Sequence, residues 1–497
     1  MLGILIMTAL LGGSIDVTTT GLVDHGALPP SATKLTYDAA DSTKNRRKDI
    51  AVNSRSEDLI LDGAKRGKMQ ANASDIHRNF AIVSWMVRRH LDYVASFQFH
   101  ARTEDKDFND LLEAKVADWS RPYNFDAAGR HSMQRYLRIL EGQAVLKGDV
   151  GTLKLASGYV QGIESDRIRN TSGQTFEKDG QWIHGVKVND AGRAIAFNLC
   201  KRQPYGGWQF ERSVSASNLL LHGYFDRFDQ VRGISPLAPA LNSSRDVYEN
   251  FGYALAKAKV EQLFAMVITR EALDAAGDVE NTGEEGTERS KYNVDFGGGP
   301  VLLDMEPGDA AEFLNSQNPS ANFQAFTNAM LMVCLKALDI PYSFYDEGHT
   351  NFFGSRGAWM HYERSCGPKR DSLMEHLRRL TVWRLGLMLL DGELQLPRGM
   401  TSLADVDWEW VPTGMPWWDP AKEIRGNLMA IAAALDTPQR ICKESGTGDW
   451  FDNVDEIAKA IKYAQDKLGP LNASISFNPG PAPLEIAVNA DQSASTN

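Results

Sequence analysis

Two glycine-containing stretches have residue types that could bind a phosphate group. Gly63–Met69 has the composition of a phosphate loop, but it has one residue too few between its glycines, and Met69 stands where a Ser or Thr would bind magnesium. Gly446 and Gly448 lack the third glycine of a dinucleotide fingerprint, and no clear strand pattern precedes them. Neither stretch predicts a nucleotide site.

Histidine, a common metal ligand and proton carrier, is scattered along the chain. His90 and His100 are ten residues apart, and His361 and Glu363 are two apart, so neither pair shares a face of a helix. The sequence contains no His-Glu-x-x-His, no Gly-x-Ser-x-Gly and no His/Cys/Cys deaminase set. We therefore expect structural histidines, no metal ion, no cofactor and no enzymatic activity.

Cysteine is also sparse, and no two cysteines form a CxxC pair that would suggest a zinc site. The chain contains Cys200, Cys334, Cys366 and Cys442. A framework of disulfides is typical of short secreted chains with many more cysteines per residue. We predict buried or free thiols in a reducing compartment.

The chain of 497 residues is acidic, with 53 Lys and Arg against 64 Asp and Glu and a formal net charge of -11. Hydrophobic residues make up 43% and charged residues 24%, which indicates a globular protein and excludes fibrous, disordered and multi-span membrane proteins. At roughly 100–200 residues per domain, two to four domains are expected. The acidity argues against a protein that binds nucleic acid by neutralising its phosphates.

The two ends of the chain differ in composition from its middle. The first dozen residues are apolar, but they lack the basic flank and cleavage site of a secretory signal and are too few to span a bilayer. We expect residues 1–75 to form an N-terminal arm, and we expect no membrane contact. Residues 469–497 are rich in Pro, Ala, Ser and Asn, which predicts a disordered tail.

Most of the net charge lies in one segment, residues 272–318. Eleven acidic residues stand there against two basic ones, a net charge of -9. The residues that we single out as an acidic patch are Glu280, Glu284, Glu285 and Glu288. Two short strand-like runs, 292–296 and 300–304, lie in the same segment, which predicts a small acidic unit with strands.

Periodicity predicts helices on both sides of a β-rich module. Apolar residues at helical spacing begin after Ser74 and Asp75, which could cap a helix, and continue to Leu91. Further helices are predicted over 104–120, 127–140, 323–338, 355–390, 420–435 and 454–468. Alternating runs with Gly- and Asn-containing turns between 143 and 221 predict the β-rich module. The predicted fold class is α+β.

The longest uninterrupted helical pattern runs from Ser235 to Glu271, about 36 residues or roughly 54 Å of helix. Its apolar positions repeat at alternating steps of three and four, which predicts a packing seam of coiled-coil type. The seam consists of Leu241, Tyr248, Phe251, Leu255 and Ala258. A helix of this length is expected to act as a strut.

The stretch His222–Leu237, with its His, Arg, Gln and Arg-Gly-Ile-Ser-Pro run, resembles the lambda-type family of tailed-phage portal proteins. Other blocks resemble the family in the same order, and they are Tyr37–Ala40, Asp75–Val94, Gly185–Arg193, Leu303–Asp309, Phe323–Tyr342 and Asp419–Glu423. The resemblance covers about residues 37–468. It departs from the family at Asn351–Arg356, where the usual Asn-Tyr-Ser-Ser-x-Arg is replaced by Asn-Phe-Phe-Gly-Ser-Arg.

The resemblance implies a portal fold with wing, stem, clip, tunnel loop and crown, assembled as a dodecameric ring around a central channel. Such a ring forms in the host cytoplasm, occupies one capsid vertex of the virion and conducts double-stranded DNA during packaging and ejection. The implied partners are the large terminase, the major capsid or scaffolding protein, and a head-completion or adaptor protein. Two alternatives remain open: another ring-forming head–tail connector component, and a multidomain enzyme with an unrecognised site.

The resemblance also implies a division of the chain beyond the N-terminal arm. The expected parts are a wing over 76–234, a stem helix over 235–271, an acidic clip over 272–318, a second stem helix over 319–339, a tunnel loop over 340–356, a long helix returning to the wing over 357–419 and a helical crown over 420–468. An acidic lining would repel DNA phosphates and keep the duplex from being gripped, because close cationic contacts bind DNA tightly.

The residues expected to face the channel come from the stem and the tunnel loop. Lys257 and Lys259 are candidates for weak contacts with DNA. The tunnel-loop candidates are Phe344, Tyr345, His349, Asn351, Phe352, Phe353 and Arg356. Bulky and mostly uncharged side chains of this kind would contact a duplex sterically.

Overall fold

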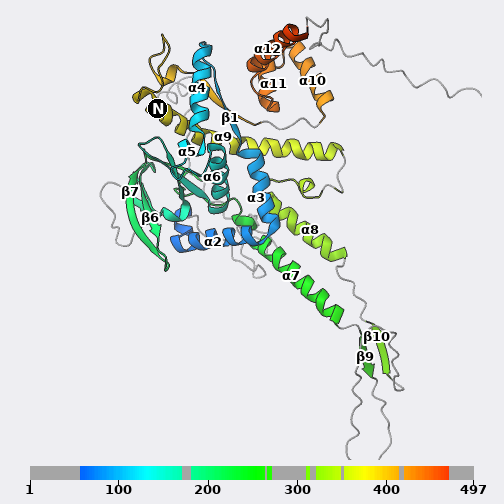
Figure 1. The fold of residues 1–497 in the computed structure, drawn as a ribbon. Helices are drawn as coiled ribbons and strands as arrows, with labels where there is room; N and C mark the ends of the chain where they lie inside the picture. The colour runs from blue at the N-terminus through cyan, green and yellow to red at the C-terminus, as the bar shows by residue number, and fades with distance from the viewer. Residues whose placement is uncertain are drawn as a thin grey trace, which may run out of the picture. The chain divides into compact units, whose positions relative to one another are not determined.

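The computed structural model describes residues 56–170, 181–263, 266–270, 309–313, 321–346, 348, 352–413 and 419–468 (Figure 1). The predicted acidic patch, the arm up to residue 55 and the tail from residue 469 lie outside these ranges. No helix in the described ranges combines the length and apolarity that crossing a membrane takes. The same ranges contain no group of three or more His, Cys, Asp or Glu side chains that could hold a metal ion.

Three helices open the described chain: α1 (Glu57–Ile60), α2 (Gly63–Asn79) and α3 (Ala81–Val94). The predictions of an arm up to residue 75 and of a helix start at Ser74 are therefore wrong. Helix α2 begins earlier because the Asp62 side chain accepts hydrogen bonds from the backbone N–H groups of Ala64 and Lys65.

The next elements are β1 (Phe97–Ala101), α4 (Lys106–Trp119), α5 (Pro122–Phe125) and α6 (Met133–Lys147). The helix predicted over 104–120 is confirmed, whereas the one predicted over 127–140 lies several residues later. Ser132 caps α6 through the N–H of Arg135, and Gly148 ends it with a φ of 95°, a conformation that favours glycine. Ala144–Leu146, predicted as part of a strand, is therefore helical.

Two antiparallel sheets confirm the β-rich module. The three-stranded sheet has the order β3-β2-β8 and consists of β2 (Asp149–Lys154), β3 (Val160–Glu164) and β8 (Leu219–Gly223). The four-stranded sheet has the order β4-β5-β6-β7 and consists of β4 (Gln181–Ile183), β5 (Val186–Val188), β6 (Ala194–Arg202) and β7 (Trp208–Ser215). A small core that includes Ile163, Phe197 and Leu199 packs between them.

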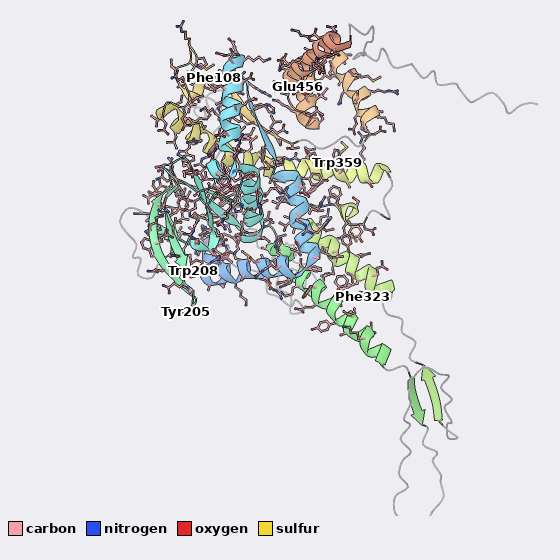
Figure 2. All side chains as sticks on the ribbon, viewed as in Figure 1. Phe108, Tyr205, Trp208, Phe323, Trp359 and Glu456 are labelled. Atoms are coloured by element: carbon pink, nitrogen blue, oxygen red, sulfur yellow. The ribbon has the colours of Figure 1, made fainter. Side chains whose placement is uncertain are left out.

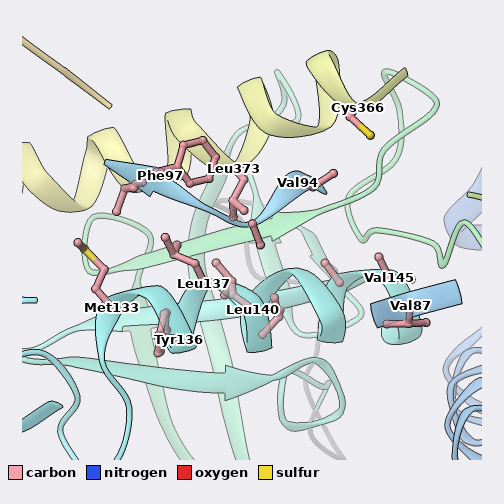
Figure 3. Packing of buried hydrophobic residues seen from close by; sticks show 14 of the residues in the cluster. Val87, Val94, Phe97, Met133, Tyr136, Leu137, Leu140, Val145, Cys366 and Leu373 are labelled. Carbon is pink, nitrogen blue, oxygen red and sulfur yellow. The ribbon is translucent and has the colours of Figure 1, made fainter. Parts of the chain in front are cut away.

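The main core gathers apolar side chains from helices that are far apart in the sequence. Figure 3 shows Leu137 and Leu140 of α6 together with Leu373 of α9 (Phe352–Leu390) in this cluster. Helix α6 packs on β2 and β8 of the three-stranded sheet, and α3 packs on both α6 and α9. Cys366 and Cys334 are buried in the same cluster, which confirms the prediction of buried thiols.

The strut predicted over 235–271 is shorter than expected. Pro236 and Pro239 delay the helix, because proline lacks an N–H donor, and a 3-10 turn at Ala238–Ala240 precedes α7 (Leu241–Leu263). At the other end Met266–Arg270 forms strand β9, which pairs antiparallel with β10 (Asp309–Phe313). The β-branched run from residue 267 to 269 favours a strand over a helix.

The remaining elements follow the pair β9–β10. Helix α8 (Ala321–Lys336) returns beside α7, and a 3-10 turn (Tyr342–Phe344) leads to α9, which spans 39 residues and confirms the helix predicted over 355–390. A short 3-10 turn (Leu403–Asp405) and strand β11 (Trp408–Pro412), paired with β1, come next. The chain ends in α10 (Pro420–Ala432), α11 (Pro438–Ser445) and α12 (Trp450–Leu468), of which α11 was not predicted.

Candidate functional site

Helices α7 and α8 form an antiparallel pair that is rooted in the main core (Figure 1). Near the root, the Ser244 hydroxyl donates a hydrogen bond to the Cys334 sulfur at 3.3 Å. Farther along α7, the ring of Phe251 meets the ring of Phe323, labelled in Figure 2, edge to face at 6.3 Å. A residue later in α7 thus contacts a residue earlier in α8, as expected for two antiparallel helices.

Helix α8 carries apolar side chains that the described part of the subunit leaves exposed. The exposed fractions of its side chains are 58% for Phe326, 42% for Met332 and 54% for Val333, although these residues usually lie inside proteins. Lys336 is the one charged residue in the helix sequence, and the stretch from Ala329 to Leu335 is apolar throughout. We call Phe326, Met332 and Val333 the α8 face.

The predicted seam on α7 is buried near the root and exposed farther out. Leu241 is buried, as are Ser244 and Val247 beside it. Tyr248, Phe251 and Leu255 are exposed, although the Tyr248 ring lies 5.6 Å from that of Phe80 in the same subunit. Tyr248 and Leu255 lie one heptad apart on the same side of the helix, and we call them the α7 face. The α8 face was missed in the sequence, and its signal was the single charged residue in sixteen.

The predicted channel lysines, Lys257 and Lys259, are exposed in the distal half of α7. The structure does not bring them together with other predicted site residues that it describes. Glu280, Glu284, Glu285 and Glu288 lie outside the described residues, as do His349 and Asn351. The relation of the lysines to the acidic patch stays a prediction.

Two aromatic residues of the predicted tunnel loop are held by other aromatic rings. The ring of Phe344 lies 5.9 Å from Tyr93 of α3 and 5.3 Å from Tyr362 of α9. The ring of Tyr345 lies 6.2 Å from Trp85, also of α3. Phe344 is half-buried, so these contacts anchor the turn between α8 and α9 on the main core.

The last residues of the predicted loop are helical, because α9 begins at Phe352. Phe352 and Phe353 therefore belong to the first turn of that helix. Arg356 also lies in α9, and its Nη2 approaches the Glu423 Oε1 of α10 at 3.5 Å. The structure thus places Arg356 in a contact between two helices.

The motif that begins at His222 contributes to a buried polar cluster around Glu141 of α6. His222 donates from Nε2 to one carboxylate oxygen at 2.7 Å, and His90 donates from Nε2 to the other at 2.8 Å. The Tyr224 hydroxyl also donates to Glu141. Burial alone would raise the pKa of Glu141, but the bonds from the two histidines hold it below its usual value, so the carboxylate stays ionised.

This arrangement is structural rather than catalytic. Both oxygens of Glu141 are occupied by donors from α3 and β8, and all three side chains are buried away from any substrate. The bond from His90 to Glu141 is consistent with the structural role predicted for this histidine. The exposed surfaces of α7 and α8 remain the best candidate site, and their chemistry suits packing against another protein.

Known proteins share sequence with most of this chain. Residues 43–366 match the family described as "Phage portal protein, lambda family". The "Probable portal protein" of Halomonas phage phiHAP-1 is 24% identical over 391 residues, which cover 72% of this chain and 72% of that protein. A chain in the neck of an empty GTA particle is similar with a TM-score of 0.44 and 14% identity, covering 76% of this chain and 94% of that one. A chain in the virion of a native gene transfer agent particle has a TM-score of 0.41, 16% identity and the same coverage.

Proposed function

The chain belongs to the lambda family of phage portal proteins, and on this premise we propose that copies of it form a closed ring around a channel for double-stranded DNA. Portal proteins are structural components rather than enzymes. In the proposed ring the pair α7–α8 is the stem, the segment between β9 and β10 is the clip, and α10–α12 form the crown. The ring occupies one vertex of the capsid and contains about twelve subunits.

The observation that carries this proposal is the uncovered α8 face. Leaving roughly 100 Å² of apolar surface in water costs on the order of 2–3 kcal/mol, so a second protein surface is needed to cover the face. The α7 face, Tyr248 and Leu255, lies on a different helix of the same pair. When the α8 face of one copy packs on the α7 face of the next, the contact is head-to-tail, and contacts of this type form a ring when the rotation between neighbouring copies closes.

The net charge of -11 fits passage of DNA rather than tight binding. An acidic clip repels phosphates, whereas Lys257 and Lys259 supply weak attraction along the stem. If these lysines contact DNA, the double variant Lys257→Ala/Lys259→Ala changes the length of the packaged genome. The exposed lysines Lys68 and Lys201 serve as the matched alanine control, and an unchanged genome length removes the proposed role.

The turn between α8 and α9 is proposed to carry the tunnel loop. The rings of Tyr93 and Tyr362 hold Phe344, which fixes the start of the proposed loop on the main core. We also propose that the ring docks the large terminase, a capsid or scaffolding protein and a head-completion protein, and that it assembles in the host cytoplasm.

Electron microscopy of the purified full-length chain tests the ring directly. We expect particles with a central channel and about twelve subunits, because the exposed faces on α7 and α8 favour head-to-tail contacts. Single subunits or compact dimers at every protein concentration would contradict the proposal. If the rings form, but the ring in DNA-filled capsids has no DNA in its channel, a different connector component would be favoured instead.

A further inference from the structure

A second buried cluster lies just before α7, and its centre is Arg232. The Arg232 side chain is 1% exposed. Its Nε donates to Asp149 Oδ2 at 2.7 Å and its Nη2 to Asp149 Oδ1 at 2.8 Å, a bidentate pair. Nη1 donates to the carbonyl oxygens of Ile168 and His184, at 2.8 and 2.6 Å. The guanidinium therefore binds groups in several directions at once.

Asp149, the first residue of β2, is the shared acceptor. Besides Arg232 it accepts hydrogen bonds from Arg66 Nη2 of α2 at 3.0 Å, from the Gly233 N–H at 2.8 Å and from the Ser165 hydroxyl. Burial alone would raise the pKa of Asp149, but Arg232 and Arg66 lower it to about 2. The carboxylate is thus ionised, and it is buried among the groups that donate to it.

The backbone around the cluster has no room to shift. A Cβ atom on Gly233 would lie 2.2 Å from the carbonyl oxygen of Gly148, and one on Gly148 would lie 2.4 Å from that of Gly233. Two residues on, the Ser235 hydroxyl donates to the carbonyl of Val145 in α6 at 2.6 Å. The chain is therefore fixed on both sides of Arg232 until α7 begins at Leu241.

We propose that Arg232, Asp149 and Ser165 act as a positioning latch that sets the direction in which α7 leaves the main core. The Arg232 guanidinium joins the three-stranded sheet, at Asp149, to the turn between β4 and β5, at the His184 carbonyl. Asp149 in turn binds Arg66, which adds α2 to the cluster. A buried ion pair is weak evidence for added stability, because a well-packed apolar substitute is often as stable. The planar guanidinium instead fixes the directions of its hydrogen bonds, and so the orientation of the chain that carries it. The proposed stem helix α7 follows directly in the chain and depends on that orientation.

The length of α7 makes its direction matter. Its 23 residues span about 35 Å, so a tilt of about 10° at the root moves the far end by about 6 Å. A displacement of that size matches the spacing between neighbouring side chains on a helix surface, so it is enough to shift the contact by one side chain. This step rests on the proposed ring, in which the α8 face of one copy must meet the α7 face of the next in register.

The variant Arg232→Lys tests the latch, because lysine keeps the charge but cannot make the bidentate bond and the two carbonyl bonds together. Spin labels on cysteines that replace Lys68 in α2 and Lys259 in α7 report the distance between the two helices in the single subunit. We expect the width of the distance distribution to increase at least twofold in R232K. Ser165→Ala, which removes only the shared hydroxyl, is the milder second variant and should broaden it less.

The control is Leu112→Ala, which destabilises the main core at α4, where no latch residue lies. It should lower the unfolding midpoint while leaving the label distance unchanged, whereas a merely structural role of Arg232 would make R232K and L112A behave alike. An unchanged distribution in both R232K and S165A would overturn the proposal. In assembled rings, R232K should also reduce the fraction with the wild-type subunit number at least threefold. If the wild-type protein forms no rings, the proposed function is contradicted. The distance measurement in the single subunit would still show whether Arg232 positions α7.

Discussion

The main core and the helix pair α7–α8 differ in how far the side chains are buried and partnered within a single subunit. In the core, Glu141 and Asp149 are buried together with the donors that neutralise them, and Leu140 is 2% exposed. On the helix pair, Leu255 of α7 is 57% exposed and Val333 of α8 is 54% exposed. Among the described residues, the core covers its own apolar side chains, whereas large apolar side chains of the helix pair stay exposed.

Substitutions in the two regions are therefore expected to change different measurable properties. Core substitutions should change the free energy of unfolding of the subunit, since their contacts lie within it. Substitutions on the α7 and α8 faces should leave that free energy nearly unchanged and act on assembly instead. Three predictions test this division.

The largest effect is expected for Leu140→Ala in the main core. Removing a buried leucine side chain leaves a cavity and costs about 2–5 kcal/mol of unfolding free energy. The matched variant is Leu255→Ala on α7, which makes the same chemical change on an exposed face and should cost less than about 0.5 kcal/mol. Chemical denaturation of the subunit measures both values. Equal losses in the two variants would mean that α7 is covered within one copy, and the comparison would fail.

The second prediction concerns acid sensitivity of the core. His376 of α9 is buried, donates to or accepts from Thr152 at 3.0 Å, and faces the His222 ring at 5.5 Å between centroids. Burial, together with the charges of His222 and Arg379, lowers the pKa of His376 well below its usual value, so it stays neutral in the fold. The unfolded chain binds the proton below about pH 6.5, and stability therefore falls as the pH decreases.

This group alone should lower the unfolding free energy by about 1 kcal/mol between pH 6.5 and 5.5. His376→Gln keeps a hydrogen-bonding side chain near Thr152 but cannot take up the proton. The loss of stability over this pH range should therefore be smaller in H376Q by about that amount. Identical pH profiles for H376Q and the wild type would show that His376 is not neutral when buried.

Helices and strands were predicted correctly from the sequence where the local pattern alone determines them. The helices near 104–120 and 355–390 and the β-rich module follow from periodicity and turn residues, and the structure confirms them. The strut over 235–271 was too long, because proline at its start and a β-branched run at its end outweigh helical spacing. The motif at His222–Leu237 was recognised by resemblance, but its role could not be predicted, since Glu141 and Asp149 reach it only through the tertiary fold.

The candidate site shows the same limit. The seam on α7 was found from spacing, but spacing does not tell which side of a helix meets its neighbour in the chain and which side stays exposed. The α8 face has no motif at all, and only the lack of charge in α8 indicates it. Phe344 was expected in a free loop, and its ring contacts with Tyr93 and Tyr362 join three separate segments.

The smallest effect on the subunit is expected for Val333→Asp on the α8 face. Val and Asp have similar helix propensities, and the side chain is more than half exposed, so the unfolding free energy should change by no more than about 0.5 kcal/mol. Assembly should respond strongly, because a carboxylate at the centre of an apolar contact must be desolvated without a partner. Sizing by light scattering should show single subunits where the wild type gives rings. Tyr123→Asp, a charge placed on an 80% exposed side chain between α4 and α6, should leave the rings intact. Rings of normal size in V333D would mean that the α8 face lies outside the contact, and the proposed head-to-tail packing of α8 on α7 would have to be abandoned.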